Sequence, residues 1–231
     1  FGACKKEDAK PSITINATGI KDAAFKISFT SLDSVLAKSK LVDGKAELDL
    51  ALEYPQLIAI EIEGVETPIV FFAVLTAMTV DYDATKTPPF KITGSVYNDS
   101  LEVFGAKQTA NETYMRNLYP AYEAAMKAND SLTLFVINSQ ADSSYEYFNA
   151  YTKAFATRNS VVGTMIAMTY MYTAEYSDLL PIYDGVPVKY RSAPDVVKFK
   201  ERMDKLENTQ IGKRFTDITQ KDTTGVDLSI S

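Results

Sequence analysis

The spacing of apolar side chains changes once along the chain, near Gly94, and this change restricts the folds open to it. Before Gly94, apolar residues recur at every second position, which is typical of strands with one face in a core. After Gly94 they recur at steps of three and four residues, which is typical of helices. The sequence therefore predicts an α+β fold, with an N-terminal β domain followed by an α-helical segment.

The region of period two covers residues 12–95 and contains several short strand signals. Turn signals separate them at residues 16–19, Asp43-Gly44, Glu63-Gly64 and residues 87–89. Short strands at this spacing, with one apolar face each, predict an antiparallel β-sandwich. The apolar sets that define the strand faces are Ile13/Ile15, Phe25/Ile27/Phe29, Ala46/Leu48/Leu50/Leu52, Ile58/Ile60/Ile62, Val70/Phe72, Met78/Val80/Tyr82 and Phe90/Ile92.

The helical segment is predicted over residues 96–210. Its first helix follows the four-residue step of Tyr114, Leu118 and Tyr122, and Pro120 should kink or interrupt it. The short apolar run at residues 132–137 cannot be typed by periodicity alone, and we assign it to a helix because its neighbours are helical.

Three further helix signals follow in the same segment. Residues 145–155 and 165–172 carry helical stripes, and Asn159 or Ser160 should cap the second of them. Ser192-Ala193-Pro194-Asp195 matches a capping box at the start of a helix. The inward stripe of that last helix is predicted to be Val196, Phe199, Met203 and Leu206.

Composition limits the chemistry of the chain. Its 231 residues contain no histidine, which removes the commonest general base and the commonest metal ligand. Lys and Arg number 24 against 30 Asp and Glu, and no basic patch stands out, so nucleic acid is not an expected partner. The longest apolar run, at residues 68–79, is too short to span a bilayer.

The single cysteine lies in an informative setting. Phe1-Gly2-Ala3-Cys4 is followed by Lys5-Lys6-Glu7-Asp8, so small residues precede a cysteine and a charged stretch follows it. This arrangement resembles the end of a lipoprotein signal, which predicts lipidation at Cys4 and a tether over residues 1–11. The protein would then be held at the cell envelope, periplasmic or on the outer membrane, by a lipid anchor alone. A free thiol in an N-terminal tail is the alternative.

The C-terminal residues 211–231 are predicted to form a hairpin. A strand over residues 211–217 is followed by the Asp222 to Gly225 turn signal and a second alternating stretch. This run resembles the opening hairpin of thioredoxin-like domains of the alkyl-hydroperoxide-reductase/thiol-specific-antioxidant type. In that family the hairpin precedes a buried strand and a Cys-X-X-Cys motif.

The order of motifs along the whole chain adds to this resemblance. Asp33-Ser34, Asp43-Gly44-Lys45, residues 93–99 with Leu101 and Phe104, and residues 158–163 occur in the same order in the non-catalytic N-terminal regions of envelope thiol-disulfide oxidoreductases. The chain departs from many relatives at Arg214-Phe215-Thr216, where they carry a proline. The resemblance implies that the partner is a C-terminal thioredoxin-like domain, that the full-length protein is a thiol-disulfide oxidoreductase, and that no residue in this region is catalytic.

Two groups of side chains are candidate sites. The carboxylates Glu61/Glu63/Glu66 and Asp81/Asp83 alternate with apolar residues, which is typical of the solvent face of a strand rather than of a catalytic or metal site. Among 14 tyrosines, Tyr119, Tyr147 and Tyr170 fall outside the strongest apolar stripes and could form an interaction surface. No cofactor or metal is expected.

We therefore expect a non-catalytic anchoring or partner-recognition region of a cell-envelope thiol-disulfide oxidoreductase, which could also contact an envelope protein or peptide. The alternative is a stand-alone envelope module in which the sandwich and helices form a cleft for a peptide or glycan.

Overall fold

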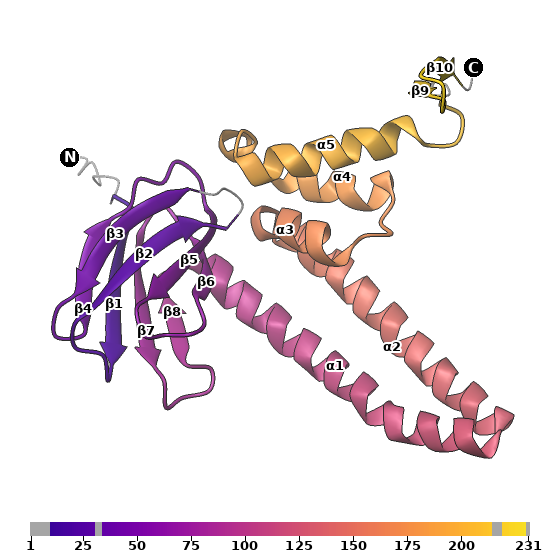
Figure 1. The fold of residues 1–231 in the computed structure, drawn as a ribbon, viewed down its shortest axis with the longest axis horizontal. Coiled ribbons are helices and arrows are strands. Elements are labelled where there is room, and N and C mark those ends of the chain that lie inside the picture. Colours follow the sequence, from indigo (N-terminus) through magenta and orange to yellow (C-terminus); the bar gives the residue numbers. More distant parts are fainter. Residues whose placement is uncertain (1–9, 31–33, 214–218, 230–231) are drawn as a thin grey trace, which may run out of the picture.

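A computed structural model describes residues 10–30, 34–213 and 219–229 (Figure 1). These residues form two β-sheets in the N-terminal part, then five α-helices and a short C-terminal hairpin. The predicted α+β class, with a β-rich domain followed by helices, is confirmed. Cys4 lies outside the described residues.

The N-terminal part is a sandwich of two four-stranded sheets. The first sheet has the order β4 (Lys45–Asp49), β1 (Ser12–Thr18), β7 (Ala77–Asp83) and β8 (Phe90–Thr93). The second has the order β3 (Val35–Leu41), β2 (Ala23–Phe29), β5 (Gln56–Ile62) and β6 (Ile69–Ala73). All neighbouring strands are antiparallel except β1 and β7, which run parallel. The sandwich is therefore mostly antiparallel rather than wholly antiparallel as predicted. The prediction missed the parallel pair because side chains alternate in the same way in parallel and antiparallel strands.

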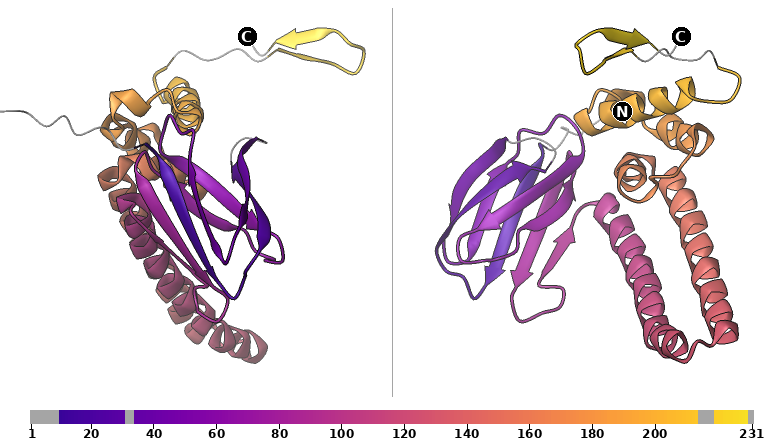
Figure 2. Two further views of the ribbon diagram at one scale, coloured as in Figure 1. Left: turned by 90° about the vertical axis from the view of Figure 1, so that its left-hand side faces the viewer. Right: turned by 45° about the vertical axis from the view of Figure 1, so that its right-hand side comes forward.

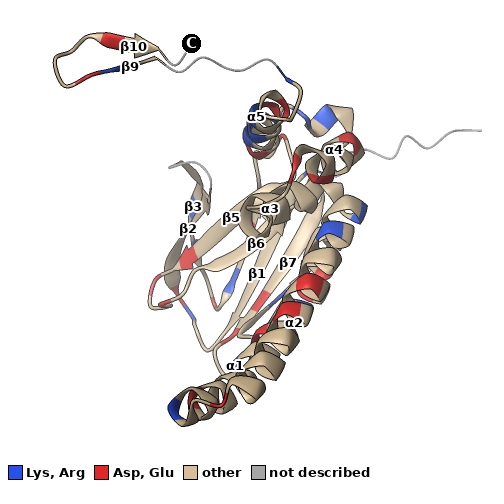
Figure 3. Cartoon of the chain, turned by 90° about the vertical axis from the view of Figure 1, so that its right-hand side faces the viewer, with Lys and Arg blue, Asp and Glu red and all other residues tan. Residues whose placement is uncertain are grey.

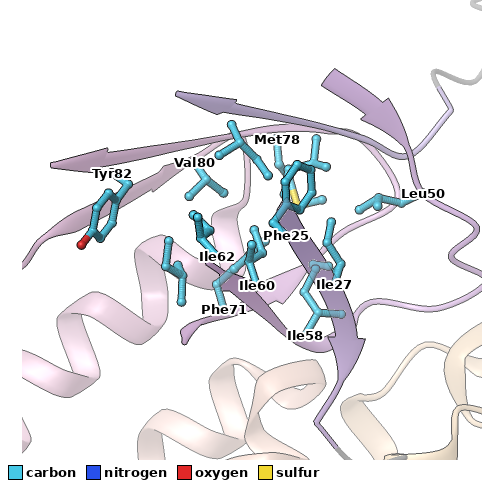
Figure 4. Packing of buried hydrophobic residues seen from close by; sticks show 14 of the residues in the cluster. Phe25, Ile27, Leu50, Ile58, Ile60, Ile62, Phe71, Met78, Val80 and Tyr82 are labelled. Carbon is cyan, nitrogen blue, oxygen red and sulfur yellow. The ribbon is translucent and has the colours of Figure 1, made fainter. Parts of the chain in front are cut away.

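The two sheets enclose a core of branched aliphatic and aromatic side chains (Figure 4). Ile15 on β1, Ile27 on β2 and Ile60 on β5 are fully buried, as the alternating pattern predicts. Burying each such side chain stabilises the fold by about 1.5–3 kcal/mol. The sequence periodicity thus identifies the inward face of these strands correctly.

Strand β6 was assigned the wrong inward face. Val70 and Phe72 were predicted to face the sandwich core, but Ile69, Phe71 and Ala73 do so. Val70 is exposed, and Phe72 is buried in a second core that the helices contribute. Because both faces of this strand carry apolar residues, the alternation in the sequence cannot show which face points into the sandwich core.

The Asp43-Gly44 turn carries the chain from one sheet to the other. Both residues have positive φ, 50° and 76°, and Val42 and Lys45 exchange two backbone hydrogen bonds across the turn. A Cβ on Gly44 would lie 2.7 Å from the carbonyl oxygen of Ala17, so this position requires glycine for space as well as for its backbone conformation. The turn predicted from these two residues is confirmed.

Helices α1 (Val96–Ala128) and α2 (Ser131–Arg158) form a long antiparallel hairpin that projects from the sandwich (Figure 1). We call this hairpin the arm. At 1.5 Å per residue, α1 is about 50 Å long and α2 about 42 Å. The arm turns at Asn129, which is left-handed, and Asp130, whose carboxylate accepts the backbone N–H of Thr133 at the start of α2. The helical assignment of residues 132–137 is confirmed.

Helix α1 continues through Pro120, so of the predicted kink or interruption, the interruption is wrong. Proline removes one hydrogen bond to the carbonyl of Arg116, and both residues are exposed, so water can reach that carbonyl. The following turn contains Ala124 and Ala125, which are strong helix formers, and α2 packs along the same stretch. These contributions outweigh the local cost of the proline.

Three shorter helices stack at the root of the arm: α3 (Ser160–Tyr170), α4 (Tyr176–Gly185) and α5 (Pro194–Asn208), with a 3-10 turn at Val188–Tyr190. Asn159 is the N-cap position of α3, although its side chain donates back to Phe155. The predicted inward stripe of α5 is confirmed, since Phe199 and Met203 are almost fully buried.

The capping box predicted at Ser192 is absent from α5. Ala193 is the N-cap, Pro194 is the first helical residue, and the Ser192 hydroxyl donates instead to the hydroxyl of Tyr54 at 3.1 Å. The fixed φ of proline suits the first helical position and starts the helix without a side-chain cap.

Arg202 joins α5 to the C-terminal end of α3. Its guanidinium group donates to the backbone carbonyls of Ala167 and Met171.

Asn98 joins the arm to the edge strand of the second sheet. Its amide oxygen accepts the backbone N–H of Phe72 at 2.9 Å, and its amide nitrogen donates to the Phe72 carbonyl at 2.9 Å. The carboxamide therefore occupies the place that a further strand would take beside β6. Ser95, the N-cap of α1, also donates to the Phe72 carbonyl, and the rings of Phe72 and Tyr97 meet edge to face at 5.5 Å.

The C-terminal hairpin consists of β9 (Thr219–Lys221) and β10 (Asp227–Ser229). A hairpin is present as predicted, but its first strand begins at Thr219 rather than Ile211, and residues 211–213 belong to turns. Residues 214–218 of the predicted strand lie outside the described residues. Every residue of β9 and β10 is exposed, and the hairpin stands apart from the helices (Figure 2).

Candidate functional site

The outer part of the arm exposes an unusual number of large apolar side chains. Leu132, Phe135 and Val136 are 73%, 69% and 47% exposed, and Tyr114 and Tyr147 are 44% and 57% exposed. In the same part of the arm only Ala125 and Ile137 are buried. We call the surface formed by Tyr114, Leu132, Phe135, Val136 and Tyr147 the arm face.

Helical geometry explains why these side chains remain uncovered. Leu132, Leu134, Phe135, Val136 and Ile137 are five apolar residues within six positions, so on a helix of 3.6 residues per turn they point in all directions. A single antiparallel neighbour covers only one stripe of α2, and Leu134 and Ile137 occupy that stripe. A helix that is apolar around its circumference is normally covered on more than one side.

An open groove of about 550 Å³ runs along the arm face. Its lining includes Tyr114 from α1 and Phe135, Val136 and Tyr147 from α2. Ser144 also lines the groove, and its hydroxyl donates to the side chain of Asn111 on α1 at 2.7 Å. The remaining lining residues are Ser139, Gln140 and Ser143, which are polar but uncharged.

Basic side chains are absent from the outer part of α2, where Figure 3 shows red bands and places blue ones only near the root of that helix. Between residues 129 and 152 the sequence contains no Lys or Arg, and its acidic residues are Asp130, Asp142 and Glu146. Lys107 reaches the groove from α1, where its ammonium group lies 4.7 Å from the ring centre of Tyr147. The arm face is therefore apolar and nearly uncharged, which suits contact with another apolar surface.

The root of the arm is fixed by an aromatic cluster. The Phe104 ring lies 5.0 Å from that of Phe155, 5.5 Å from that of Tyr170 and 5.9 Å from that of Phe148. Phe104 is 2% exposed, and Phe72 of the sandwich belongs to the same buried cluster. This packing holds the arm in a fixed direction relative to the sandwich.

The three tyrosines predicted from sequence are all exposed, but they do not form one surface. Tyr170 packs on Phe104 at the root of the arm, and Tyr147 lies beside Lys107 in the groove. Tyr119 lies 15 residues beyond Phe104 on α1, which is about 22 Å along the helix. Only Tyr147 belongs to the arm face.

A second, larger groove of about 970 Å³ lies between the edges of the two sheets and the first turns of α1. Phe90, Tyr82 and Leu101 give it apolar walls, and Asn16 and Asp81 add polar groups. The volume is within the usual range for small-ligand sites, about 300–1,000 Å³. A third, more enclosed gap between β5, α3 and α5 holds only about 220 Å³ and is too small for such a ligand.

The carboxylates take part in local contacts. Glu61 forms an ion pair with Lys26 at 3.0 Å, and Asn16 donates to Asp81 at 2.7 Å. Asp83 accepts from the hydroxyl and backbone N–H of Thr85, and these hydrogen bonds hold the pKa of the Asp83 carboxyl below its usual range. Glu63 and Glu66 line a shallow surface depression at one end of the second sheet.

No metal site or membrane span is found in the described part of the chain. Across residues 10–30, 34–213 and 219–229, no three Asp, Glu, Cys or His side chains come together in a way that could hold a metal ion. Within the same ranges no helix is both long and apolar enough to cross a bilayer.

No protein-family model, curated protein or solved structure matches the chain.

Two features of the structure do not follow from the sequence alone. One is the role of Asn98 in joining α1 to β6, because its partner, the backbone of Phe72, is brought next to it only by the fold. The run at residues 132–137 predicts a helix but does not by itself predict the arm face. The signal that reveals it is the surplus of apolar residues in that run over what one neighbouring helix can cover.

Proposed function

We propose that this chain is a non-catalytic recognition region that binds a protein partner through the arm face. One observation carries the proposal: residues 132–137 of α2 are apolar around the helix circumference but are covered on one side only, which leaves Leu132, Phe135 and Val136 exposed. Aromatic and aliphatic side chains in such patches supply most of the energy of protein–protein contacts.

The resemblance of the sequence motifs supports a more specific setting. In this proposal the region accompanies a thioredoxin-like domain at the cell envelope, with a lipid on Cys4 as its anchor. The arm then selects or positions a partner while the thioredoxin-like domain exchanges disulfides. Exchange of this kind requires an attacking and a resolving thiol, and the 231 residues contain one cysteine.

Site-specific photocrosslinking tests the recognition role. A photoreactive phenylalanine analogue replaces Phe135 in cells that carry the native gene, and the matched control carries it at Tyr145, an exposed aromatic position about 15 Å further along α2 and on the side opposite Val136. We expect a discrete crosslinked species from position 135 and much less from position 145. Equal crosslinking at the two positions, or none at either, would contradict the proposal.

Two measurements test the proposed setting. Alkyne-labelled fatty acid should be incorporated into the native protein and lost in Cys4→Ser; persistent labelling would contradict the anchor. A longer chain that includes a Cys-X-X-Cys motif should reduce insulin disulfides, and residues 1–231 alone should not. Turnover by the 231 residues that survives Cys4→Ser would refute their non-catalytic role.

The groove between the sheet edges favours a second candidate function, binding of a peptide or glycan. Its aromatic and amide groups, Phe90 and Asn16 among them, are the types that stack on and hydrogen-bond to such ligands. Calorimetry with a panel of oligosaccharides and peptides tests this alternative. Binding that is weakened by Phe90→Ala and unchanged by Phe135→Ala would favour the groove over the arm.

A further inference from the structure

We propose that the partner of the arm face is a second copy of this chain, so that two arms pair into a four-helix bundle. This inference rests on the proposed function, since it names the partner that the arm face recognises. The arm already has the form of half a bundle: two long antiparallel helices joined by a tight turn at Asn129 and Asp130.

The distribution of buried residues shows what the arm lacks. Its root has a core of its own around Phe104, but its outer part buries only Ala125 and Ile137. A four-helix bundle places apolar residues from all four helices in one interior. A second arm laid against the arm face would bury Phe135 and Val136 and complete that interior.

The charge of the surface also favours a second copy. The chain has a formal charge of −6, so two copies repel each other in general. The groove on the arm face is lined by Tyr, Phe, Val, Ser and Gln side chains without any Asp or Glu, and Lys107 beside Tyr147 adds a positive charge rather than a further negative one. A twofold interface brings the same patch of both subunits together, so an uncharged apolar patch is complementary to itself.

The area available is close to that of a stable dimer. Three partly exposed aromatic rings, each burying about 150–250 Å² in full, provide roughly 350 Å², and Leu132 and Val136 add about 200 Å². Together these side chains offer roughly 550 Å² on each copy, or about 1,100 Å² in total, which reaches the value of about 1,000 Å² expected of a biological interface.

The small residues on α1 make close approach possible. Ala110 precedes Tyr114 by four residues and Ala121 follows it by seven, so these exposed alanines lie on the same side of α1 as Tyr114. Large side chains from one arm can therefore lie over alanines of the other, which is the alternation of large and small residues that lets helices interdigitate.

Sedimentation equilibrium of the 231-residue chain tests the inference. We expect a reversible dimer in the micromolar range, and at least about 100-fold weaker association for Val136→Glu, which places a carboxylate in the interface twice. The matched control, Asn138→Glu, adds the same charge two residues away on another side of α2 and should leave dimerisation unchanged. Far-ultraviolet circular dichroism should give the same helix content for both variants.

Three results would overturn the dimer. These are a chain that stays monomeric at high micromolar concentration, equal dimerisation of Val136→Glu and the wild type, or an equal loss in Asn138→Glu. The photocrosslinking experiment separates these failures from a failure of the recognition role. A crosslink from position 135 to a different protein, in a monomeric chain, would reject the second copy and retain partner recognition.

Discussion

Asn98 should contribute more to stability than its position near the surface suggests. Its carboxamide makes two hydrogen bonds of 2.9 Å to the backbone of Phe72, at the point where the helical part joins β6. Asn98→Ala removes both bonds, each worth about 0.5–1.5 kcal/mol, and leaves a partly buried N–H and C=O without these partners. Alanine recovers up to about 0.7 kcal/mol through its higher helix propensity. The expected net loss is about 2 kcal/mol.

Urea denaturation followed by circular dichroism measures this loss. With a slope of about 2–3 kcal/mol per molar urea for a chain of this size, the midpoint should fall by about 0.7–1 M. The matched control is Asn138→Ala, which gains the same helix propensity at an exposed position and should be neutral or slightly stabilising. Hydrogen exchange adds a local measurement, because the Phe72 amide should lose protection in Asn98→Ala.

The reasoning on Asn98 would be refuted by a loss below about 0.5 kcal/mol together with an unchanged Phe72 amide. In that case water would replace the carboxamide without cost, and the contact between arm and sandwich would depend on the apolar residues alone.

Three other perturbations have defined outcomes. Gly163→Ala should destabilise the protein strongly in urea denaturation, because a Cβ there would lie 2.1 Å from the backbone oxygen of Ala156. Phe104→Ala should cost about 3–5 kcal/mol in the same assay, because the ring is buried among four other aromatic rings. Hydrogen bonds from Thr133 lower the pKa of Asp130, so the stability this carboxylate adds should be complete above about pH 4, the ordinary Asp value, and lost as the pH falls through the lowered pKa.

Each of these perturbations has a control in the same chain. Gly105→Ala, in α1, meets nothing within 4 Å and should stabilise the protein by about 0.5–1 kcal/mol. Val103→Ala removes a 63% exposed side chain next to Phe104 and should change little. Asp130→Asn should remove the corresponding part of the acid dependence. Similar results for a variant and its control would show that the stated contact is not the cause.

Sequence periodicity predicted the fold correctly where an element has one buried face and one solvent-exposed face. The Ile13/Ile15 and Ile58/Ile60/Ile62 sets are inward, and the stripe with Phe199 and Met203 is buried. The prediction failed at β6 because its second face is covered by helices that are distant in sequence. It also failed to give the parallel pairing of β1 and β7, since side-chain alternation is the same in both strand directions.

The candidate site was predictable only in part. Exposure of Tyr119, Tyr147 and Tyr170 was anticipated, because these residues fall outside the apolar stripes. Their separation was not, since it depends on where α3 packs against Phe104. Phe135 and Val136 lie in a run that was correctly assigned to a helix. Whether they are exposed depends on how many other helices pack around that run, and this is set by the tertiary structure rather than by the local sequence.

The continuity of α1 through Pro120 gives the arm a mechanical property. The arm is about 50 Å long and is joined to the rest of the fold at its root, so it acts as a lever, and a rotation of about 5° at its base moves the far end by about 4 Å. Asn98 and Phe104 lie at that base, whereas Asn129 is at the tip. Small rearrangements between β6 and α1 are therefore magnified where the arm is most exposed, and a load at the tip is transmitted to the edge of the sandwich.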